Sequence, residues 1–213
     1  MKSEGVQKKN IVFDFAGVVF TWQPHEFLAR LLPQRAATQE AARAFVGEFF
    51  QSFGGDWADF DRGVIEAAPL AERMARRLDL SLADARRVID AVPYQLEPIA
   101  GTVALIERLK AQGHALFFLS NMPAPYADHL DATHGFIGLF ERGIYSGRVK
   151  LIKPEPEIFT HALETFGIEA VDTVFIDDMP TNVAAARAAG WQAIQFRDPA
   201  QCEADLQALG VAL

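Results

Sequence analysis

The sequence contains very little cysteine and no long apolar run. Cys202 is the only cysteine among 213 residues, so no disulfide can form within the chain. The segment MKSEGVQKKN at its start is polar, and the apolar run after it is short and includes Asp14. This pattern predicts neither a signal peptide nor a membrane span. We therefore expect a cytoplasmic protein without a membrane partner.

Basic residues are also scarce. The chain carries 20 Lys and Arg against 28 Asp and Glu, which gives a formal net charge of −8. Because no basic stripe is available to neutralise backbone phosphates, a nucleic-acid partner is disfavoured. A small phosphorylated molecule remains compatible with this charge, since one metal ion and one lysine make a local positive site.

Apolar residues outside the middle of the first half follow an alternating pattern. Short β-branched or aromatic runs are separated by amphipathic stretches of helical length. The strand-like runs are 11–13, 115–119, 173–176 and 192–196, and the helix-like stretches are 98–113, 156–167 and 181–190. This alternation predicts an α/β fold, with a Rossmann-like parallel sheet and right-handed crossovers.

Residues 21–94 have a different pattern. They contain no strand-like run, and their Ala, Arg, Leu and Phe residues recur at helical spacing. Ser81 followed by Asp84 resembles a capping box at a helix start. We predict an all-helical cap over 21–94, inserted into a core made of 1–20 and 95–213.

Polar side chains follow three of the predicted strands. Asp14, Ser120 and Asp177 each come directly after a buried apolar run, and Asp178 is next in the chain. The carboxyl ends of parallel strands form one edge of the sheet, where ligands bind in open α/β folds. Lys153 lies in a loop before a helix and is expected to lean over the same edge.

The carboxylates suggest a metal-assisted reaction. Asp14 is able to attack a phosphorus or carbon centre and form a covalent intermediate. Asp177 and Asp178 would repel Asp14 unless a cation lay among them. Mg²⁺ fits best, because it takes oxygen ligands, waters and a substrate phosphate.

The remaining polar groups are suited to bind the phosphate. Ser120, Asn121 and the turn amides near Gly17 are candidates for holding its non-bridging oxygens. Lys153 is a candidate for neutralising the charge that develops during transfer.

This set of four motifs resembles the haloacid dehalogenase-like superfamily, specifically its members with a helical cap between the first two motifs. The resemblance implies that Asp14 is the nucleophile, Ser120 the phosphate-binding hydroxyl and Lys153 the lysine of the third motif. It further implies that Asp178 ligates Mg²⁺ directly, with Asp177 behind it. The backbone carbonyl of Ala16 would be another metal ligand.

The side chain of Ala16 departs from the superfamily pattern. Most phosphatases that this chain resembles have an Asp there, which protonates the leaving group, and such an acid contributes about 10²–10⁴-fold. Three explanations remain open. The substrate has a good leaving group, such as a sugar 1-phosphate or an acyl phosphate; the cap supplies the acid, for which His25 is the candidate; or the chemistry is different.

Two other chemistries are known among the proteins that the chain resembles. Phosphonoacetaldehyde hydrolases share the Asp-x-Ala-Gly pattern but need a cap lysine for an imine, and no lysine lies between Lys9 and Lys110. The 2-haloacid dehalogenases lack the acidic pair that this chain keeps, although a cap arginine such as Arg30 could hold a substrate carboxylate.

The leading expectation is a Mg²⁺-dependent phosphatase that acts on a small phosphorylated metabolite through an aspartyl phosphate. The alternatives are a 2-haloacid dehalogenase-type hydrolase and a non-catalytic relative that binds a phosphorylated ligand.

Overall fold

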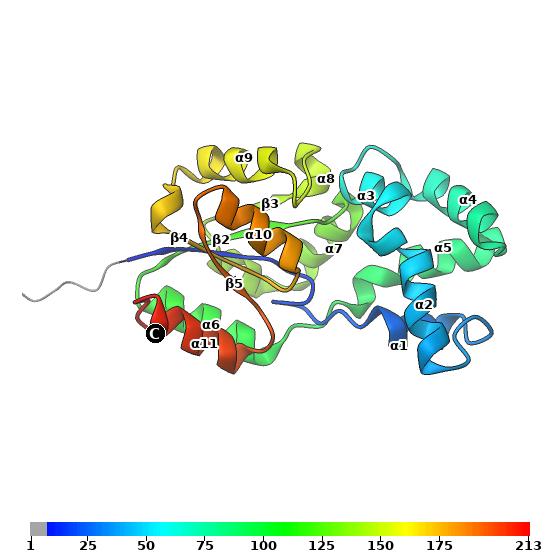
Figure 1. Ribbon diagram of the computed structural model, residues 1–213, viewed down its shortest axis with the longest axis horizontal. Helices are drawn as coiled ribbons and strands as arrows, with labels where there is room; N and C mark the ends of the chain where they lie inside the picture. Colours follow the sequence, from blue (N-terminus) through cyan, green and yellow to red (C-terminus); the bar gives the residue numbers. More distant parts are fainter. Residues whose placement is uncertain (1–7) are drawn as a thin grey trace, which may run out of the picture.

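The centre of the molecule is a five-stranded parallel sheet in the order β3-β2-β1-β4-β5 (Figure 1). The computed structural model describes residues 8–213. Residues 1–7, the first part of the polar segment MKSEGVQKKN, lie outside the described residues. The strands are β1 (Asn10–Phe13), β2 (Ala115–Ser120), β3 (Arg142–Tyr145), β4 (Thr173–Asp177) and β5 (Gln192–Gln195). The α/β fold predicted from the sequence is confirmed.

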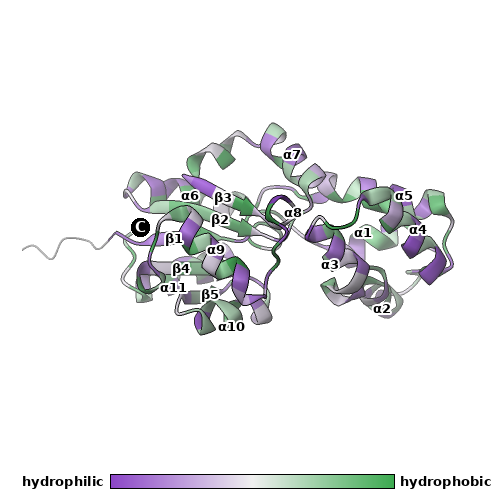
Figure 2. Cartoon of the chain, turned by 90° about the horizontal axis from the view of Figure 1, so that it is seen from above, coloured by the Kyte–Doolittle hydropathy of each residue, from purple (hydrophilic) through white to green (hydrophobic). Residues whose placement is uncertain are grey.

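Helices cover both faces of this sheet. Alternate residues of β1 point to opposite sides: Ile11 and Phe13 pack in one apolar cluster and Val12 in another. The first cluster includes residues of α6 (Ala100–Ala111), α7 (Ala124–Thr133) and α11 (Pro199–Ala208), and the second includes residues of α9 (Pro156–Phe166) and α10 (Pro180–Ala188). Figure 1 shows α9 and α10 on one side of the sheet and α6 and α11 on the other, and in Figure 2 the strands are coloured mostly as hydrophobic.

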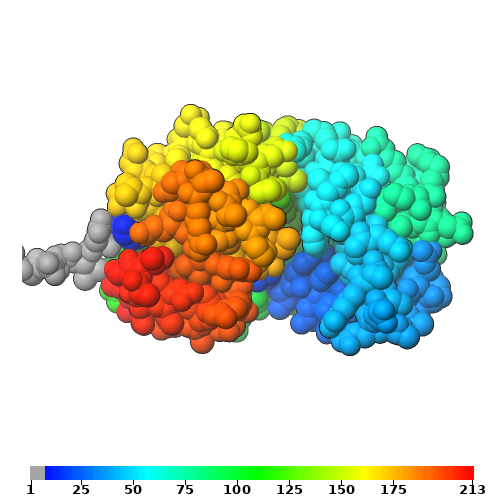
Figure 3. Space-filling view, viewed as in Figure 1, coloured from blue at the N-terminus to red at the C-terminus, as the bar shows by residue number. Residues whose placement is uncertain are grey.

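The segment between β1 and α6 contains helices and no strand. These helices are α1 (Pro24–Leu31), α2 (Gln39–Phe49), α3 (Gly55–Asp61), α4 (Ala67–Leu78) and α5 (Leu82–Ala91). They form a second lobe beside the sheet, and in the space-filling view the two lobes meet along a seam (Figures 1 and 3). None of the helices in residues 8–213 is long and apolar enough to cross a membrane.

The two connections between the lobes run side by side. The Thr21 amide donates a hydrogen bond to the Glu97 carbonyl at 2.8 Å, and the Ile99 amide donates to the Val19 carbonyl at 2.8 Å. We propose the domain boundaries 20/21 and 94/95; the first falls within these connections, and the second lies just before them, in the short 3-10 helix Val92–Gln95.

Local sequence signals explain several helix ends. The Ser81 hydroxyl accepts a hydrogen bond from the Asp84 amide at 3.0 Å, which is the capping interaction expected at the start of α5. Helix α9 begins with Pro156 and stops at Gly167, whose φ of +70° is readily adopted only by glycine.

The edge strand β3 was not predicted, because the sequence RGIY has only two buried residues.

Candidate active site

Three carboxylates meet at the carboxyl edge of the sheet. Asp14 follows β1 directly, and Asp177 is the last residue of the neighbouring strand β4. One carboxylate oxygen from each of Asp14, Asp177 and Asp178 lies within 4.8 Å of the other two. The predicted convergence of these side chains is therefore present in the structure.

Lys153 lies between two of the carboxylates. Its Nζ is 2.8 Å from Oδ1 of Asp14 and 2.7 Å from Oδ2 of Asp177, and its side chain is almost fully buried. Asn121 fixes the backbone of Lys153: the Asn121 Nδ2 donates to the Lys153 carbonyl, and the Lys153 amide donates to the Asn121 Oδ1, each at 2.9 Å. In this structure, the side chain of Asn121 positions Lys153.

The two adjacent aspartates have different surroundings. Asp177 is fully buried and accepts hydrogen bonds from the Met179 amide at 2.8 Å and from the Asn182 side chain at 3.1 Å, in addition to the bond from Lys153. Asp178 is half-buried and lines a cavity at the sheet edge. Asp178 is therefore accessible from the cavity, whereas the oxygens of Asp177 are already hydrogen-bonded within the protein.

The clustered charges perturb the acidities of these groups. Burial raises the pKa of Asp14 to about 8; the ion pair with Lys153 opposes this shift, and the carboxylates of Asp177 and Asp178 add to it. Burial also raises the pKa of Asp178 to about 6, with repulsion from Asp177 adding to the effect. Although burial alone would lower the pKa of Lys153, its two ion pairs raise it overall, so the lysine stays charged.

Gly17 allows Asp178 to approach the turn after β1. Its φ is +86°, and a Cβ built at this position would lie 2.6 Å from the Asp178 Oδ2. The Gly17 amide donates to the Phe20 carbonyl at 2.8 Å. This bond engages the Gly17 amide within the turn, so phosphate binding by the turn amides near Gly17 stays a prediction; the structure shows that Gly17 leaves space for the Asp178 carboxylate.

Ser120 presents a buried polar atom without a partner. Its side chain is fully buried at the end of β2, and its hydroxyl forms no hydrogen bond within residues 8–213. Leaving a buried hydroxyl unpaired costs free energy, so this atom is suited to a bound oxygen.

The donor set fits a hard divalent cation. Three carboxylates with a single lysine leave an excess of negative charge, and oxygen atoms are the ligands that Mg²⁺ prefers. The turn that carries Ala16 adds its backbone carbonyl as a candidate ligand. Burial raises the pKa values of Asp14 and Asp178 and mutual repulsion adds to the rise; a cation held by both residues would relieve that repulsion.

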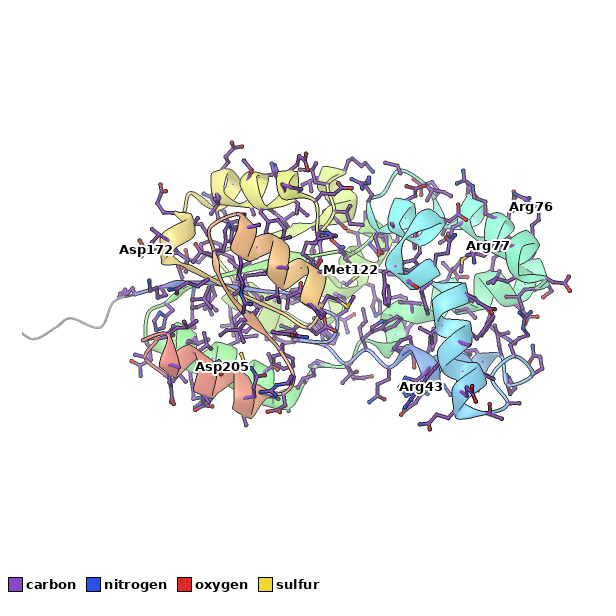
Figure 4. The ribbon with its side chains drawn as sticks, in the orientation of Figure 1. Arg43, Arg76, Arg77, Met122, Asp172 and Asp205 are labelled. Atoms are coloured by element: carbon purple, nitrogen blue, oxygen red, sulfur yellow. The ribbon has the colours of Figure 1, made fainter. Side chains whose placement is uncertain are left out.

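A cavity of about 440 Å³ extends from these carboxylates to the cap. Figure 4 shows Met122, which lines this cavity, at the junction of the two lobes. Much of the wall away from the carboxylates is apolar, formed by Trp22, Val46, Phe53, Trp57, Val92, Leu96, Met122 and Tyr126.

The cap contributes a different titratable residue to the cavity from the one that the sequence suggested. His25 does not line this cavity; its side chain is 37% exposed and lies 3.8 Å from Glu26. His25 as the acid supplied by the cap therefore stays a prediction, one that its position outside the cavity lining does not favour. Asp61, at the end of α3, does line the cavity and was missed, because α3 is short and an acidic residue on a helix resembles an ordinary surface residue.

Comparisons with known proteins agree with this geometry. Residues 8–190 match the family model described as haloacid dehalogenase-like hydrolase. A sesquiterpene phosphatase of Aspergillus oryzae is 28% identical over 191 residues, which cover 89% of this chain and 90% of that protein. A phosphoglycolate phosphatase of Cupriavidus necator is 31% identical over 129 residues, and the match covers 61% of this chain and 55% of the relative.

A solved structure shares the fold. It is a HAD family enzyme of Bacteroides thetaiotaomicron in complex with magnesium and inorganic phosphate, with a TM-score of 0.71 and 21% identity; the match covers 90% of this chain and 96% of that one. Taken with the family match over residues 8–190, these findings show that the chain is a hydrolase of the haloacid dehalogenase-like family.

Proposed function

We propose that this protein is a Mg²⁺-dependent phosphatase in which Asp14 attacks the phosphorus of a small phosphorylated metabolite. The observation that carries the proposal is the convergence of Asp14, Asp178 and Lys153 on one cavity. The retained acidic pair favours a metal-dependent phosphatase over a dehalogenase, and the relatives that are named phosphatases support the same choice.

Each residue has a defined task in the proposed reaction. Asp14 attacks phosphorus and becomes an aspartyl phosphate, and Lys153 neutralises charge on the transferring group. The Ser120 hydroxyl, which has no partner within residues 8–213, donates a hydrogen bond to a phosphate oxygen. Asp14, Asp178 and the Ala16 carbonyl would hold Mg²⁺, and the bound ion would supply positive charge that stabilises the phosphate group.

The cavity walls favour an apolar organic group on this phosphate. A sugar ring would exchange water for the apolar walls formed by residues such as Trp57 and Leu96, and each unpaired hydroxyl would cost free energy. An isoprenoid chain would instead gain from burial there. The relative named as a sesquiterpene phosphatase supports this choice over the sugar 1-phosphate suggested by the sequence.

A substrate panel with and without Mg²⁺ tests the proposal. We expect the purified protein to release phosphate from p-nitrophenyl phosphate and from farnesyl monophosphate only when Mg²⁺ is present. The catalytic efficiency is expected to be higher for farnesyl monophosphate than for glucose 1-phosphate. Halide release from 2-chloropropionate without metal would favour the dehalogenase, and ligand binding without any turnover would favour a binding protein.

A further inference from the structure

The proposed function leaves one chemical requirement unmet at Ala16. Cleavage of an alkyl phosphate releases an alkoxide, a strong base that needs a proton as the bond breaks. Ala16 lines the cavity, but its methyl group cannot supply that proton. An acid must therefore come from elsewhere in the cavity, and the requirement is strict if the substrate is an alkyl phosphate rather than an acyl phosphate.

The cap contributes one carboxyl group to this cavity, in addition to those at the sheet edge. Asp61 is the last residue of α3, and it lines the same cavity as Asp14 and Lys153. Asp61 is only 8% exposed, and the cavity wall around it includes the aromatic side chains of Trp57 and Tyr126. Asp61 therefore lies on the cap side, opposite the carboxylates of the sheet edge.

Asp61 lacks the cation that usually accompanies a buried carboxylate. Within residues 8–213 no ion pair to Asp61 forms, whereas the next residue, Arg62, is paired with Glu155. Burial raises the pKa of Asp61 well above its usual range, and the negative charge of Asp14 adds to this; Lys153 and a hydrogen bond from Trp57 act in the opposite direction. The protonated form, which is the form that an acid catalyst needs, is thereby favoured.

Contacts between the lobes hold Asp61 in place. Its backbone carbonyl accepts a hydrogen bond from the Ser146 hydroxyl, which itself accepts one from the Met122 amide at 2.8 Å. Arg62 donates to a Glu155 carboxylate oxygen at 2.7 Å, so the residue that follows Asp61 is also fixed to the core. The end of α3 is thus anchored beside the sheet edge.

We propose that Asp61 is the general acid and base that Ala16 does not provide, an inference that rests on the phosphatase function proposed above. As the Asp14 oxygen bonds to phosphorus and the bond from phosphorus to the leaving oxygen breaks, Asp61 gives its proton to that oxygen and the alcohol departs. Asp61, now a carboxylate, takes a proton from the water that attacks the aspartyl phosphate. Phosphate leaves, and both Asp14 and protonated Asp61 are restored.

A leaving-group comparison tests this role. We expect Asp61→Asn to lower kcat/KM for farnesyl monophosphate by about 10²–10⁴-fold. With p-nitrophenyl phosphate the decrease should be several-fold at most, because p-nitrophenolate departs without protonation and kcat/KM reports steps up to that departure. Asp59→Asn, also in α3 but outside the cavity lining, is the matched control and should leave both values unchanged.

A second variant tests whether the lost function is acid catalysis. The double variant Ala16→Asp with Asp61→Asn places an acid on the core side of the cavity in place of the one removed from the cap. It should restore much of the activity toward farnesyl monophosphate. Equal losses on both substrates in Asp61→Asn, or unchanged activity on farnesyl monophosphate, would overturn the inference while leaving the phosphatase function standing. If the wild type with Mg²⁺ hydrolysed neither substrate, the proposed function itself would fail, and this inference with it.

Discussion

Lys153 forms a buried ion pair with Asp14, with 2.8 Å between the Nζ and the Oδ1, and the same nitrogen is 2.7 Å from Asp177. A single cation thus connects the turn after β1 to the end of β4. This arrangement links stability to the proposed chemistry, since the group that neutralises the buried carboxylates is also the one that would face the phosphate.

Removing the lysine charge is expected to destabilise the protein. Lys153→Met leaves three neighbouring carboxylates without their cation, and breaking a buried ion pair typically costs about 3–5 kcal/mol. Urea unfolding in EDTA should show this loss in the free energy of unfolding, and added Mg²⁺ should recover part of it. Full stability of Lys153→Met without metal would contradict this assignment of the ion pairs.

Removing the charge of Asp14 should abolish activity without lowering stability. Burial disfavours the charged form of Asp14, and repulsion from Asp177 and Asp178 adds to this; together they outweigh the ion pair with Lys153, since the pKa of Asp14 is raised overall. The melting temperature of Asp14→Asn should therefore stay at or above that of the wild type. Phosphate release should nevertheless fall to background, because an amide does not act as the nucleophile. Thermal melting and a phosphate assay on the same preparation separate the two effects.

The raised pKa of Asp178 predicts a pH-dependent stability in the absence of metal. Its ordinary value is 3.8 and its folded value is about 6. Between these values the folded state holds a proton that the unfolded chain has lost, so the contribution is full below pH 3.8 and is lost as the pH rises through about 6.

The wild type in EDTA should therefore lose stability relative to Asp178→Asn as the pH is raised across this window. The free energy of unfolding of both proteins, measured along a pH series, checks the difference. Saturating Mg²⁺ should flatten the wild-type curve, and parallel curves for the two proteins in EDTA would refute the assignment.

Gly17 offers a test of the space that the site requires. Gly17→Ala places a Cβ 2.6 Å from the Asp178 Oδ2 and forces a positive φ, which alone costs about 1–2 kcal/mol. Gly167→Ala is the matched control, because its φ is +70° and no heavy atom lies within 4 Å of the added Cβ. Both variants should lose stability, but only Gly17→Ala should weaken Mg²⁺ binding in a calorimetric titration; equal binding would contradict the role of Gly17.

The sequence predicted the sheet edge better than the cap, for a physical reason. Asp14 directly follows β1, and Ser120 and Asp177 are the last residues of β2 and β4. Parallel strands end at one edge of the sheet, so the meeting of these residues follows from the fold. The cap side of the cavity depends on how helices pack onto the core. Asp61 reaches the cavity because Ser146 and the Arg62–Glu155 ion pair hold the end of α3 against the core. These contacts join residues far apart in the chain, so no local sequence pattern predicts them.

Some individual roles could not be read from residue type. The position of Asn121 next to Ser120 predicts a phosphate contact, which stays a prediction, whereas its hydrogen bonds to the backbone of Lys153 are visible only in the structure. His25 is the only histidine in 21–94, yet it does not line the cavity, and its Nε2 lies 3.8 Å from the Oε1 of Glu26. The short edge strand β3 likewise lacked the apolar run by which the other strands were found.

Covalent labelling of Asp14 tests the central claim most directly. Acid quenching of the enzyme during turnover of p-nitrophenyl phosphate with Mg²⁺, followed by peptide mass spectrometry, should place one phosphoryl group on Asp14. The label should be absent in EDTA and in Asp14→Asn, which should also release no phosphate. If Asp14→Asn turned over at the wild-type rate, Asp14 would not be the nucleophile and this account of the site would be wrong.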